Sequence, residues 1–191
     1  DVRVFSTSYG QTVRSNAFEY TTTYPLMQVL GTNGSSIVTN GESVSLSKGT
    51  DFGHVSLGQF VTNLFAITNS GPIPLSIGGV ATTGTDAALF EVADLVQTIP
   101  AGGRVLISVT FAPSTPGFFT AALTLANDST STPYVVNLRG SAWQLSTNWG
   151  PYSGGNELLI TNGLLGNGMD ITNVLVGGVS ATVVTQGTTW V

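Results

Sequence analysis

The sequence predicts an all-β fold made of β-sandwiches, and three observations support this prediction. Apolar residues recur with a period of nearly two in Val105–Phe111 and Ala121–Ala126, which is typical of strands with one buried face. Turn-forming clusters such as Asn69–Pro72 separate such stretches at intervals of about 8–12 residues, the spacing expected of a sandwich. The one plausible helical segment is a single turn at Thr85–Phe90, capped by Asp86, and it is too short for the crossover of a doubly wound fold.

The predicted strands fall into three segments of the chain. Residues 1–24 hold two strands and a Thr-rich exit, residues 25–142 hold a full set, and residues 143–191 start again after Gly140–Ala142. In the middle segment, strands are expected at Gln28–Leu30, Ser43–Leu46, Thr50–Gly58, Phe60–Thr68, Val105–Phe111, Ala121–Ala126 and Tyr134–Leu138. In the last segment they are expected at Asn156–Ile160, Asn173–Gly178 and Ala181–Val184.

The same pattern predicts several core positions. Phe52 and Val55 would anchor the first core strand of the middle segment. Phe111 would close another core strand, because Pro113 cannot donate a ladder hydrogen bond. We also expect five apolar side chains to meet across the sandwich: Leu64, Phe65 and Ile67 on one strand, and Leu123 and Leu125 on another.

Composition narrows the class of protein. Charged residues make up 8% of the chain, against about 25% in an average soluble domain, so Ser, Thr, Asn, Gln and Gly must cover much of the surface. Five Lys and Arg against ten Asp and Glu form no basic stripe, which argues against nucleic acid as a partner. Without cysteine there is neither a disulfide nor a thiolate metal site, although this absence fits both surface and cytosolic proteins.

The chain begins at Asp1 without an initiator Met, and it contains neither a signal peptide nor an apolar run of about 18 residues. We therefore expect a processed or excised piece of a protein, with any anchor outside it. No direct membrane insertion is expected of this segment.

A series of short motifs in the middle of the chain carries a family resemblance. In order they are Thr50–Gly58, Ile67–Leu75, Gly84–Phe90, Ile99–Gly103, Val109–Ser114, Pro116–Gly117 and Asn137–Gly140. With this spacing they resemble the abnormal-spindle/hydin-like (ASH) immunoglobulin-type domain in its bacterial choice-of-anchor D form. Residues 26–49 resemble the leading strand and hairpin often attached to such domains. The resemblance implies one complete immunoglobulin-like sandwich in residues 25–142.

The two ends of the chain resemble complementary parts of a second domain, of the IPT/TIG immunoglobulin-like type. Its opening strands match Gly150–Gly155, Leu159–Asn162 and Val174–Thr182, and its closing strands match Val2–Phe5 and Ala17–Tyr20. Such domains usually carry a Pro-rich loop between these parts, and the loop would be missing if Val191 joined Asp1 directly. The resemblance implies immunoglobulin-like β-sandwiches in tandem, one complete and one split between the chain ends at residues 1–24 and 143–191.

Neither end segment can bury its apolar side alone, so each is expected to be completed by a neighbouring unit. The expected assembly interface comprises Val2, Val4, Phe5, Phe18, Tyr20, Leu158, Ile160, Val174, Val176 and Trp190. Packing between successive sandwiches is expected from Tyr24, Pro25, Trp143, Trp149 and Tyr152, although a Trp and Tyr patch could also bind carbohydrate. Tyr24–Pro25 and Ser141–Ala142 are expected to be short linkers that limit bending.

The sequence offers little catalytic chemistry. His54 is the single histidine and has no Cys, His or paired carboxylate near it in sequence, so we expect a solvated strand position rather than a metal ligand. Asp51 beside it is expected to be a turn or strand-start residue. No Asp-rich calcium motif, phosphate loop or activated nucleophile is present, so no catalytic, cofactor-binding or metal residue is predicted. Asn33 and Asn127 match the N-glycosylation pattern.

These observations predict a non-catalytic structural repeat or subunit of an extracellular filament, stalk or large surface adhesin. Its partner would be itself, either as covalent tandem repeats or by donated strands. A first alternative is an adhesion module that binds surface glycans or host proteins. A second alternative is an intracellular scaffold of the ciliary type, because ASH domains also occur in ciliary and centrosomal proteins.

Overall fold

The computed structural model of the chain describes residues 2–14, 24–146, 155–162 and 165–191. It confirms the predicted all-β class, since the described residues form strands and a single 3₁₀ turn, η1 (Ala87–Leu89). An N-terminal hairpin consists of β1 (Val2–Ser6) and β2 (Gly10–Arg14). The central strands are β3 (Met27–Leu30), β4 (Ile37–Val38), β5 (Asp51–Ser56), β6 (Val61–Asn69), β7 (Leu75–Thr83), β8 (Phe90–Val92), β9 (Gln97–Ile99), β10 (Arg104–Phe111), β11 (Gly117–Asn127) and β12 (Tyr134–Leu145). The C-terminal strands are β13 (Ile160–Asn162), β14 (Val174–Val176) and β15 (Val179–Ala181).

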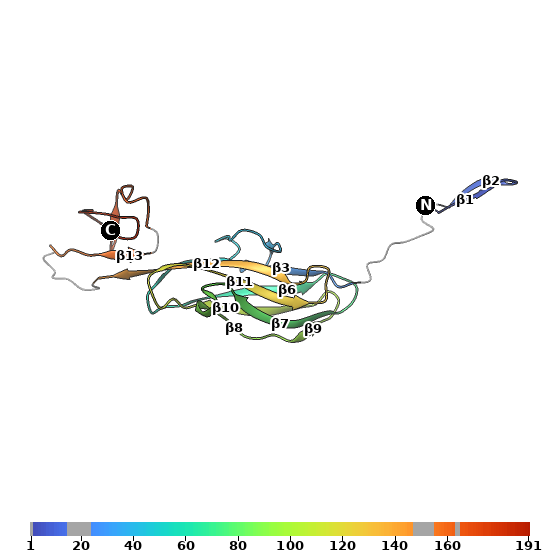
Figure 1. Cartoon of the computed structure of the whole chain (residues 1–191), viewed down its shortest axis with the longest axis horizontal. Coiled ribbons are helices and arrows are strands. Elements are labelled where there is room, and N and C mark those ends of the chain that lie inside the picture. Colours follow the sequence, from blue (N-terminus) through green and yellow to red (C-terminus); the bar gives the residue numbers. More distant parts are fainter. Residues whose placement is uncertain (1, 15–23, 147–154, 163–164) are drawn as a thin grey trace.

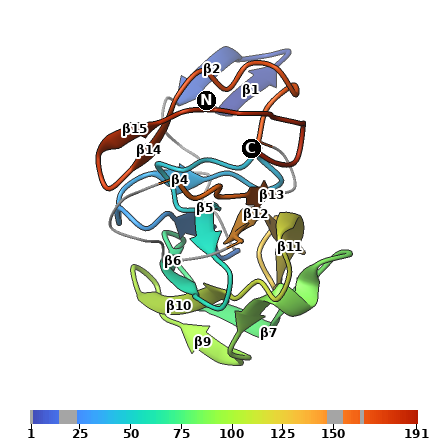
Figure 2. The same cartoon turned by 90° about the vertical axis from the view of Figure 1, so that its left-hand side faces the viewer.

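The central strands form a two-layered sandwich (Figures 1 and 2). The first sheet has the order β4-β3-β6-β10-β8, and all its pairs are antiparallel. The second sheet has the order β13-β12-β11-β7-β9, and β5 pairs with β12 in parallel. Seen along the long axis, β6 and β10 lie in one layer and β7 and β11 in the other (Figure 2). This is the arrangement expected of an immunoglobulin-like sandwich.

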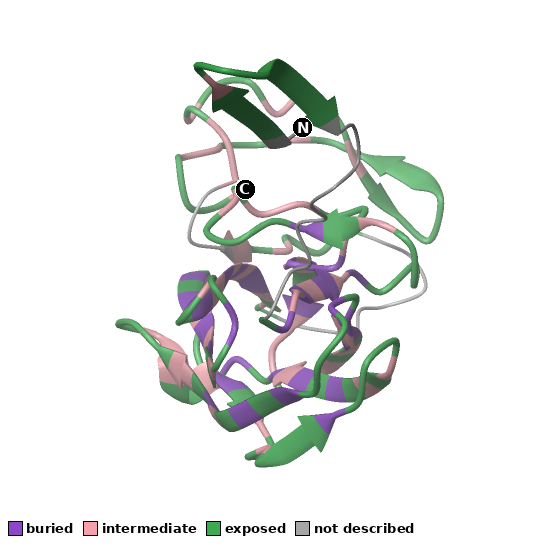
Figure 3. Cartoon of the chain, turned by 90° about the vertical axis from the view of Figure 1, so that its right-hand side faces the viewer, coloured by how far each residue is buried: buried purple, intermediate pink, exposed green. Residues whose placement is uncertain are grey.

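The buried residues lie in the strands of the central sandwich (Figure 3). The core lies between its two layers, because alternate side chains of each sheet point inward. Its centre is a cluster of four phenylalanines, Phe52, Phe90, Phe111 and Phe119, all buried. The rings of Phe90 and Phe111 stack with centroids 4.7 Å apart, and Phe52 meets Phe90 edge-on at 5.5 Å. Such pairs stabilise a core slightly beyond the area that they bury.

Phe52 and Val55 are confirmed as core residues, although they are three positions apart in one strand. A regular strand would send one of them to solvent, because successive side chains alternate between faces. Gly53 resolves this, since its φ of +68° and a shift in register against β12 create a bulge. At the start of the same strand, Asp51 pairs with Arg139 at 2.5 Å. The sequence analysis had missed this ion pair.

Two expectations about the central sandwich are wrong. Leu64 lies on the outer face, 53% exposed, whereas its neighbours Phe65 and Ile67 are buried with the leucines of β11. The alternation of a strand cannot place residues 64 and 65 on the same face. The predicted strand Ser43–Leu46 is also absent. Its backbone is used in turns, as the Ser45 carbonyl accepts the N–H groups of residues 50 and 51.

The predicted helical turn is present as η1, with Phe90 buried and Leu89 packed against the core. Asp86 precedes this turn but makes no side-chain capping bond. Its carboxylate instead accepts the backbone N–H of Thr120, at 2.9 Å, and so ties the turn to β11. The cap prediction failed because a long-range backbone donor lies within reach of Asp86.

The edge of β12 that could pair with another chain is covered within the sandwich. The Gly41 N–H donates to the Val135 carbonyl at 2.8 Å, and the Asn40 side chain accepts the Val135 N–H at 2.8 Å. The Asn137 side chain donates to the backbone of Glu42 at 2.9 Å. The outermost strands β4, β8 and β9 have only two or three residues each. Short and covered edges disfavour sideways strand addition.

Replacing Tyr134 with phenylalanine is expected to lower the free energy of unfolding by about 1–3 kcal/mol at neutral pH. The buried Tyr134 hydroxyl donates to the Val38 carbonyl at 2.5 Å, and this acceptor would lose its partner. Burial raises the pKa of Tyr134, and the charge of Glu42 adds to this effect. A raised pKa in the folded state means that the stabilisation is complete below the unfolded pKa and is lost as pH rises through the folded pKa.

Urea unfolding at neutral and at alkaline pH measures both effects. The wild-type protein should lose stability with rising pH in this window, and Tyr134→Phe should lose less. Tyr9→Phe is a matched control, because Tyr9 is 94% exposed and should show neither effect. Equal alkaline losses in wild type and Tyr134→Phe would contradict the assignment.

Candidate assembly site

The candidate site begins where β12 leaves the central sandwich. Ser141 and Ala142 are 2% and 0% exposed inside this strand, so the expected linker at these residues is wrong. The strand continues to Leu145 because its backbone finds a further partner in β13, where Leu145 faces Ile160. The Ser146 N–H extends this pairing by donating to the Leu159 carbonyl at 2.8 Å. One strand therefore belongs both to the central sandwich and to the C-terminal segment.

The rest of the C-terminal segment lies against β13 and in a two-stranded ribbon. Ile160 and Val191 exchange two backbone hydrogen bonds, of 2.8 and 3.0 Å, so β13 has a partner on each side. The ribbon of β14 and β15 turns through Gly177 and Gly178. Both glycines have positive φ, +60° and +84°, as a two-residue type I′ hairpin requires. The strand expected at Ala181–Val184 is displaced, since β15 begins at Val179 and ends at Ala181.

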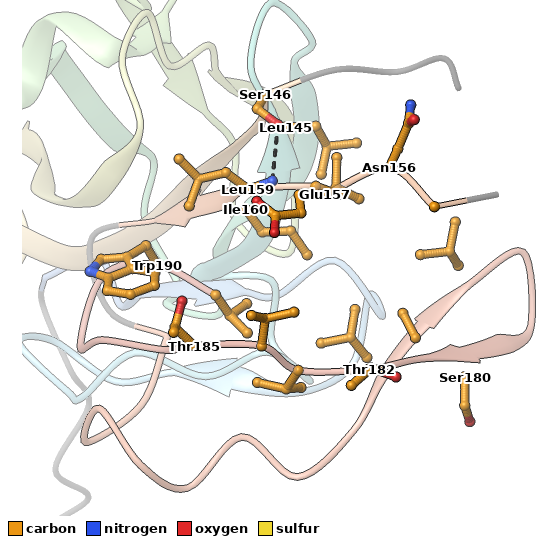
Figure 4. Close-up of a pocket in the computed structure, with 18 residues that line it drawn as sticks. Leu145, Ser146, Asn156, Glu157, Leu159, Ile160, Ser180, Thr182, Thr185 and Trp190 are labelled. Carbon is orange, nitrogen blue, oxygen red and sulfur yellow. Dashed lines mark hydrogen bonds between the residues drawn. The ribbon is translucent and has the colours of Figure 1, made fainter. Parts of the chain in front are cut away.

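These elements surround an apolar groove of about 1080 Å³ (Figure 4). The apolar side chains that line it are Leu145, Leu158, Leu159, Ile160, Val174, Val176, Val183, Val184, Trp190 and Val191. Five residues of the predicted assembly interface are thereby brought together: Leu158, Ile160, Val174, Val176 and Trp190. Leu145, Val183 and Val191 were missed, although the apolar stretch of residues 181–184 was a usable signal.

The side chains that line the groove form an incomplete core, because they stay accessible to solvent. Among residues 155–161 and 165–191, none is buried, and Val176 and Val184 remain 53% and 71% exposed. A two-stranded ribbon is marginally stable without a further layer. Contiguous apolar surface of this kind is rarely left exposed on a folded domain. Glu157 is the one charged side chain among the residues that line the groove.

The N-terminal hairpin is a pair of strands that does not pack on another sheet of the described chain. Within residues 2–14 and the other described parts of the chain, β1 and β2 pair only with each other. Val4, Phe5 and Val13 are 56%, 72% and 46% exposed. Val2 lies in β1, while Phe18 and Tyr20 lie outside the described residues.

The hairpin and the groove lie at opposite ends of the central sandwich (Figure 1). Within the described residues, neither strand of the hairpin pairs with the C-terminal segment. Of the expected inter-domain residues, Pro25 is buried at the start of the sandwich and Tyr24 is 42% exposed beside it. Trp143 is half-buried in β12, next to the pairing with β13. Trp149 and Tyr152 lie outside the described residues.

The two glycosylation candidates sit in differently built loops. The Asn33 side chain is exposed and donates to the Ser36 hydroxyl at 2.7 Å. The Asn127 side chain is half-buried, and its amide nitrogen donates to two carbonyls, those of Leu125 and Ser131, at 3.0 and 3.2 Å. Both amide nitrogens donate two hydrogen bonds, so exposure separates the sites, and the exposed Asn33 is the more accessible of the two. Glycosylation itself stays a prediction.

A polar contact joins β5 to β12. His54 lies on β5 with an exposed side chain, and its Nδ1 contacts the Ser141 hydroxyl at 2.5 Å. Within the described part of the chain, no three His, Asp or Glu side chains converge to hold a metal ion. No helix among those residues is long and apolar enough to cross a membrane.

Burial near Glu42 raises the pKa of that carboxyl, but hydrogen bonds from Lys48 and Thr39 outweigh it and leave the pKa below its usual value. The 2.7 Å pair of Glu42 with Lys48 closes the loop that precedes β5. It is therefore a structural contact of the central sandwich and not a reactive site.

Comparison with known proteins identifies the central sandwich. The family described as "HYDIN/CFA65/VesB-like, Ig-like domain" matches residues 43–141, slightly more than half of the chain. This confirms the immunoglobulin-like domain predicted from the motifs. The IPT/TIG resemblance of residues 1–24 and 143–191 stays a prediction. A comparison with curated protein sequences gives no match.

Several solved structures are similar to the chain. They include a protein of unknown function from Porphyromonas gingivalis W83 (15% identity, TM-score 0.43, 73% of this chain and 61% of that chain). The Vibrio cholerae VesB protease has 17% identity and a TM-score of 0.36, over 48% of this chain and 29% of that one. The ASH/PapD-like domain 7 of human CEP192 has 9% identity and a TM-score of 0.36, over 69% and 95%.

The chain spans less than two thirds of the length of the Porphyromonas and Vibrio proteins. All three TM-scores are below 0.5, so the family assignment does not rest on these structures. The family match, which lies within the two-layered sandwich, carries the assignment. The chain belongs to the family of HYDIN/CFA65/VesB-like Ig-like domains.

Proposed function

We propose that this chain is a non-catalytic structural unit of an extracellular filament, stalk or large adhesin, in which units join end to end. The groove of residues 145–191 takes up residues 2–20 of the next unit, and its partner is therefore another copy or another repeat. The observation that carries this proposal is the pairing of an unfinished apolar core at one end with an exposed apolar hairpin at the other (Figures 1 and 4).

The chemistry of the two surfaces is complementary. The hairpin of β1 and β2 offers Val4 and Phe5 on opposite faces, both exposed, so either face can enter the groove. Its strands also offer the backbone groups that the ribbon of β14 and β15 needs for further pairing. Residues 143–191 hold no Lys or Arg and carry Glu157 at the groove, whereas the hairpin carries the exposed Arg3.

The continuity of β12 supports a role as a stiff segment. Because β12 belongs to both the central sandwich and the groove, its ladder hydrogen bonds resist bending between the two. The short outermost strands and the covered edge of β12 disfavour sideways strand addition, so growth along the long axis is favoured. The proposal holds for covalent tandem repeats and for donated strands, since both create the same contacts.

The test compares the mass of the protein, purified from the cells that make it, before and after boiling in denaturant. Under native conditions we expect assemblies much larger than 19.7 kDa. If the large mass survives boiling, the units are covalent repeats; if it falls to about one chain, they are donated-strand subunits. A single, stably folded 19.7 kDa chain under native conditions would contradict the proposal.

A further inference from the structure

The outer face of the first sheet carries an apolar row that the core does not use. Ile37, Leu30, Ala66 and Leu106 are consecutive cross-strand partners on β4, β3, β6 and β10, so they share one face. Ile37 and Leu106 are 45% and 56% exposed, and Leu64 on the next row is 53% exposed. Ala66 at the centre of the row is only 4% exposed, which shows that its larger neighbours pack over it.

The outer face of the second sheet is different. There the threonines Thr83 and Thr124 contact each other through their hydroxyls at 3.3 Å, and Ala122 and Asn137 face each other across β11 and β12. Polar and small side chains are the normal covering of a solvated sheet face. Phe118 on this face is 40% exposed, but Ser141 opposite it and Thr120 further along β11 are polar, so the apolar row is a feature of the first sheet.

Polar residues border the apolar row on both sides and differ in charge. On one side, Thr62 and Thr110 join their hydroxyls at 2.8 Å, and the exposed Glu91 follows on β8. On the other side, the exposed Arg104 faces Thr68 across β10 and β6. The face has an apolar centre, an acidic border and a basic border, the pattern of a protein–protein interface.

We propose that a second copy of this chain packs on this face, sheet against sheet, with its long axis antiparallel. A two-fold axis in the plane of the interface, running across the strands between the rows of Leu64 and Leu106, places the acidic border of one copy on the basic border of the other. Glu91 of each copy then faces Arg104 of its partner, twice per dimer. The parallel arrangement would place Glu91 on Glu91 and Arg104 on Arg104, which like-charge repulsion disfavours.

The charge pattern of this face favours a second copy of the chain as its binding partner. An isologous dimer needs a self-complementary surface, and a face with opposite charges on its two borders is one. The pairing is independent of the end-to-end joining, because the face lies on β3, β4, β6, β8 and β10 and the groove lies beyond β12. In a filament it would bind two rods side by side.

Sedimentation equilibrium of the full chain tests the pairing, in a background that carries Val176→Asp to block the groove. We expect a reversible dimer whose association falls roughly tenfold or more with Leu106→Ser, since two leucines leave the interface. Phe118→Ser is the matched control, because Phe118 is 40% exposed on the other outer face. It should leave the dimer unchanged.

Charge reversal tests the orientation. Glu91→Arg and Arg104→Glu should each weaken the dimer, and the double variant should restore it. A chain that stays monomeric at all concentrations, a dimer indifferent to Leu106→Ser, or equal weakening by Phe118→Ser would overturn the surface. A double variant no stronger than the single ones would overturn the antiparallel arrangement. None of these results bears on the groove, which the native mass tests separately.

Discussion

Replacing Phe111 with alanine is expected to lower the free energy of unfolding by about 3–5 kcal/mol. The ring is fully buried at the centre of the sandwich, stacked on Phe90 and within 6.0 Å of the Phe52 and Phe119 ring centroids. Gly140 of β12 approaches the same ring so closely that a Cβ at this position would lie 2.5 Å from its edge. Residues of four strands, β5, β8, β11 and β12, thus pack around one side chain, and its removal leaves a cavity that they cannot easily close.

Chemical denaturation of the full chain followed by tryptophan fluorescence measures this loss. Phe60→Ala is the matched control, because it removes the same atoms from a side chain that is 68% exposed. We expect it to change the free energy of unfolding by about 0.5 kcal/mol or less. Similar losses for both variants would mean that Phe111 is not the centre of the core.

Replacing Val176 with aspartate is expected to lower the association constant for end-to-end joining by about a hundredfold or more. Val176 lines the groove, and the incoming hairpin would bury the new carboxylate against apolar side chains. Glu157, the one charged side chain that lines the groove, is also negative and would repel the new carboxylate. Because Val176 is 53% exposed on a ribbon outside the central sandwich, the unfolding of the sandwich should not change.

Leu175→Asp is the control for this effect. Leu175 belongs to the same strand and is 60% exposed, but it points to the opposite face of the ribbon and does not line the groove. Sedimentation velocity of the two variants under native conditions should show short species for Val176→Asp and wild-type assemblies for Leu175→Asp. If both variants assemble normally, the groove is not the joining site.

Local patterns explain which parts of the fold could be predicted. The turn at Thr85–Phe90 and the end of β10 before Pro113 depend on residues close in sequence, and both are confirmed. Leu64 was placed wrongly because two adjacent apolar residues cannot show which of them faces the core. The Asp86 cap and the Ser141–Ala142 linker failed for another reason: a partner distant in sequence, Thr120 or β13, takes the hydrogen bonds.

The candidate site divides in the same way. Leu158, Ile160 and Val176 could be selected from sequence because the end segments are apolar but too short to bury themselves. Leu145 could not, since its role depends on β12 running on into the groove. The bulge at Gly53 and the ion pair of Asp51 with Arg139 likewise need the parallel pairing of β5 with β12.

By itself, the sequence determined the all-β class and the apolar character of both ends, because alternation and turn residues act over a few positions. The immunoglobulin-like centre was implied by the resemblance of its motifs to a known family. Only the tertiary structure decided which residues those ends bring together and that the hairpin and the groove point away from each other. It also decided that one outer sheet face carries an apolar row between an acidic and a basic border. Such features arise from the pairing of strands far apart in the chain, and no local pattern records that pairing.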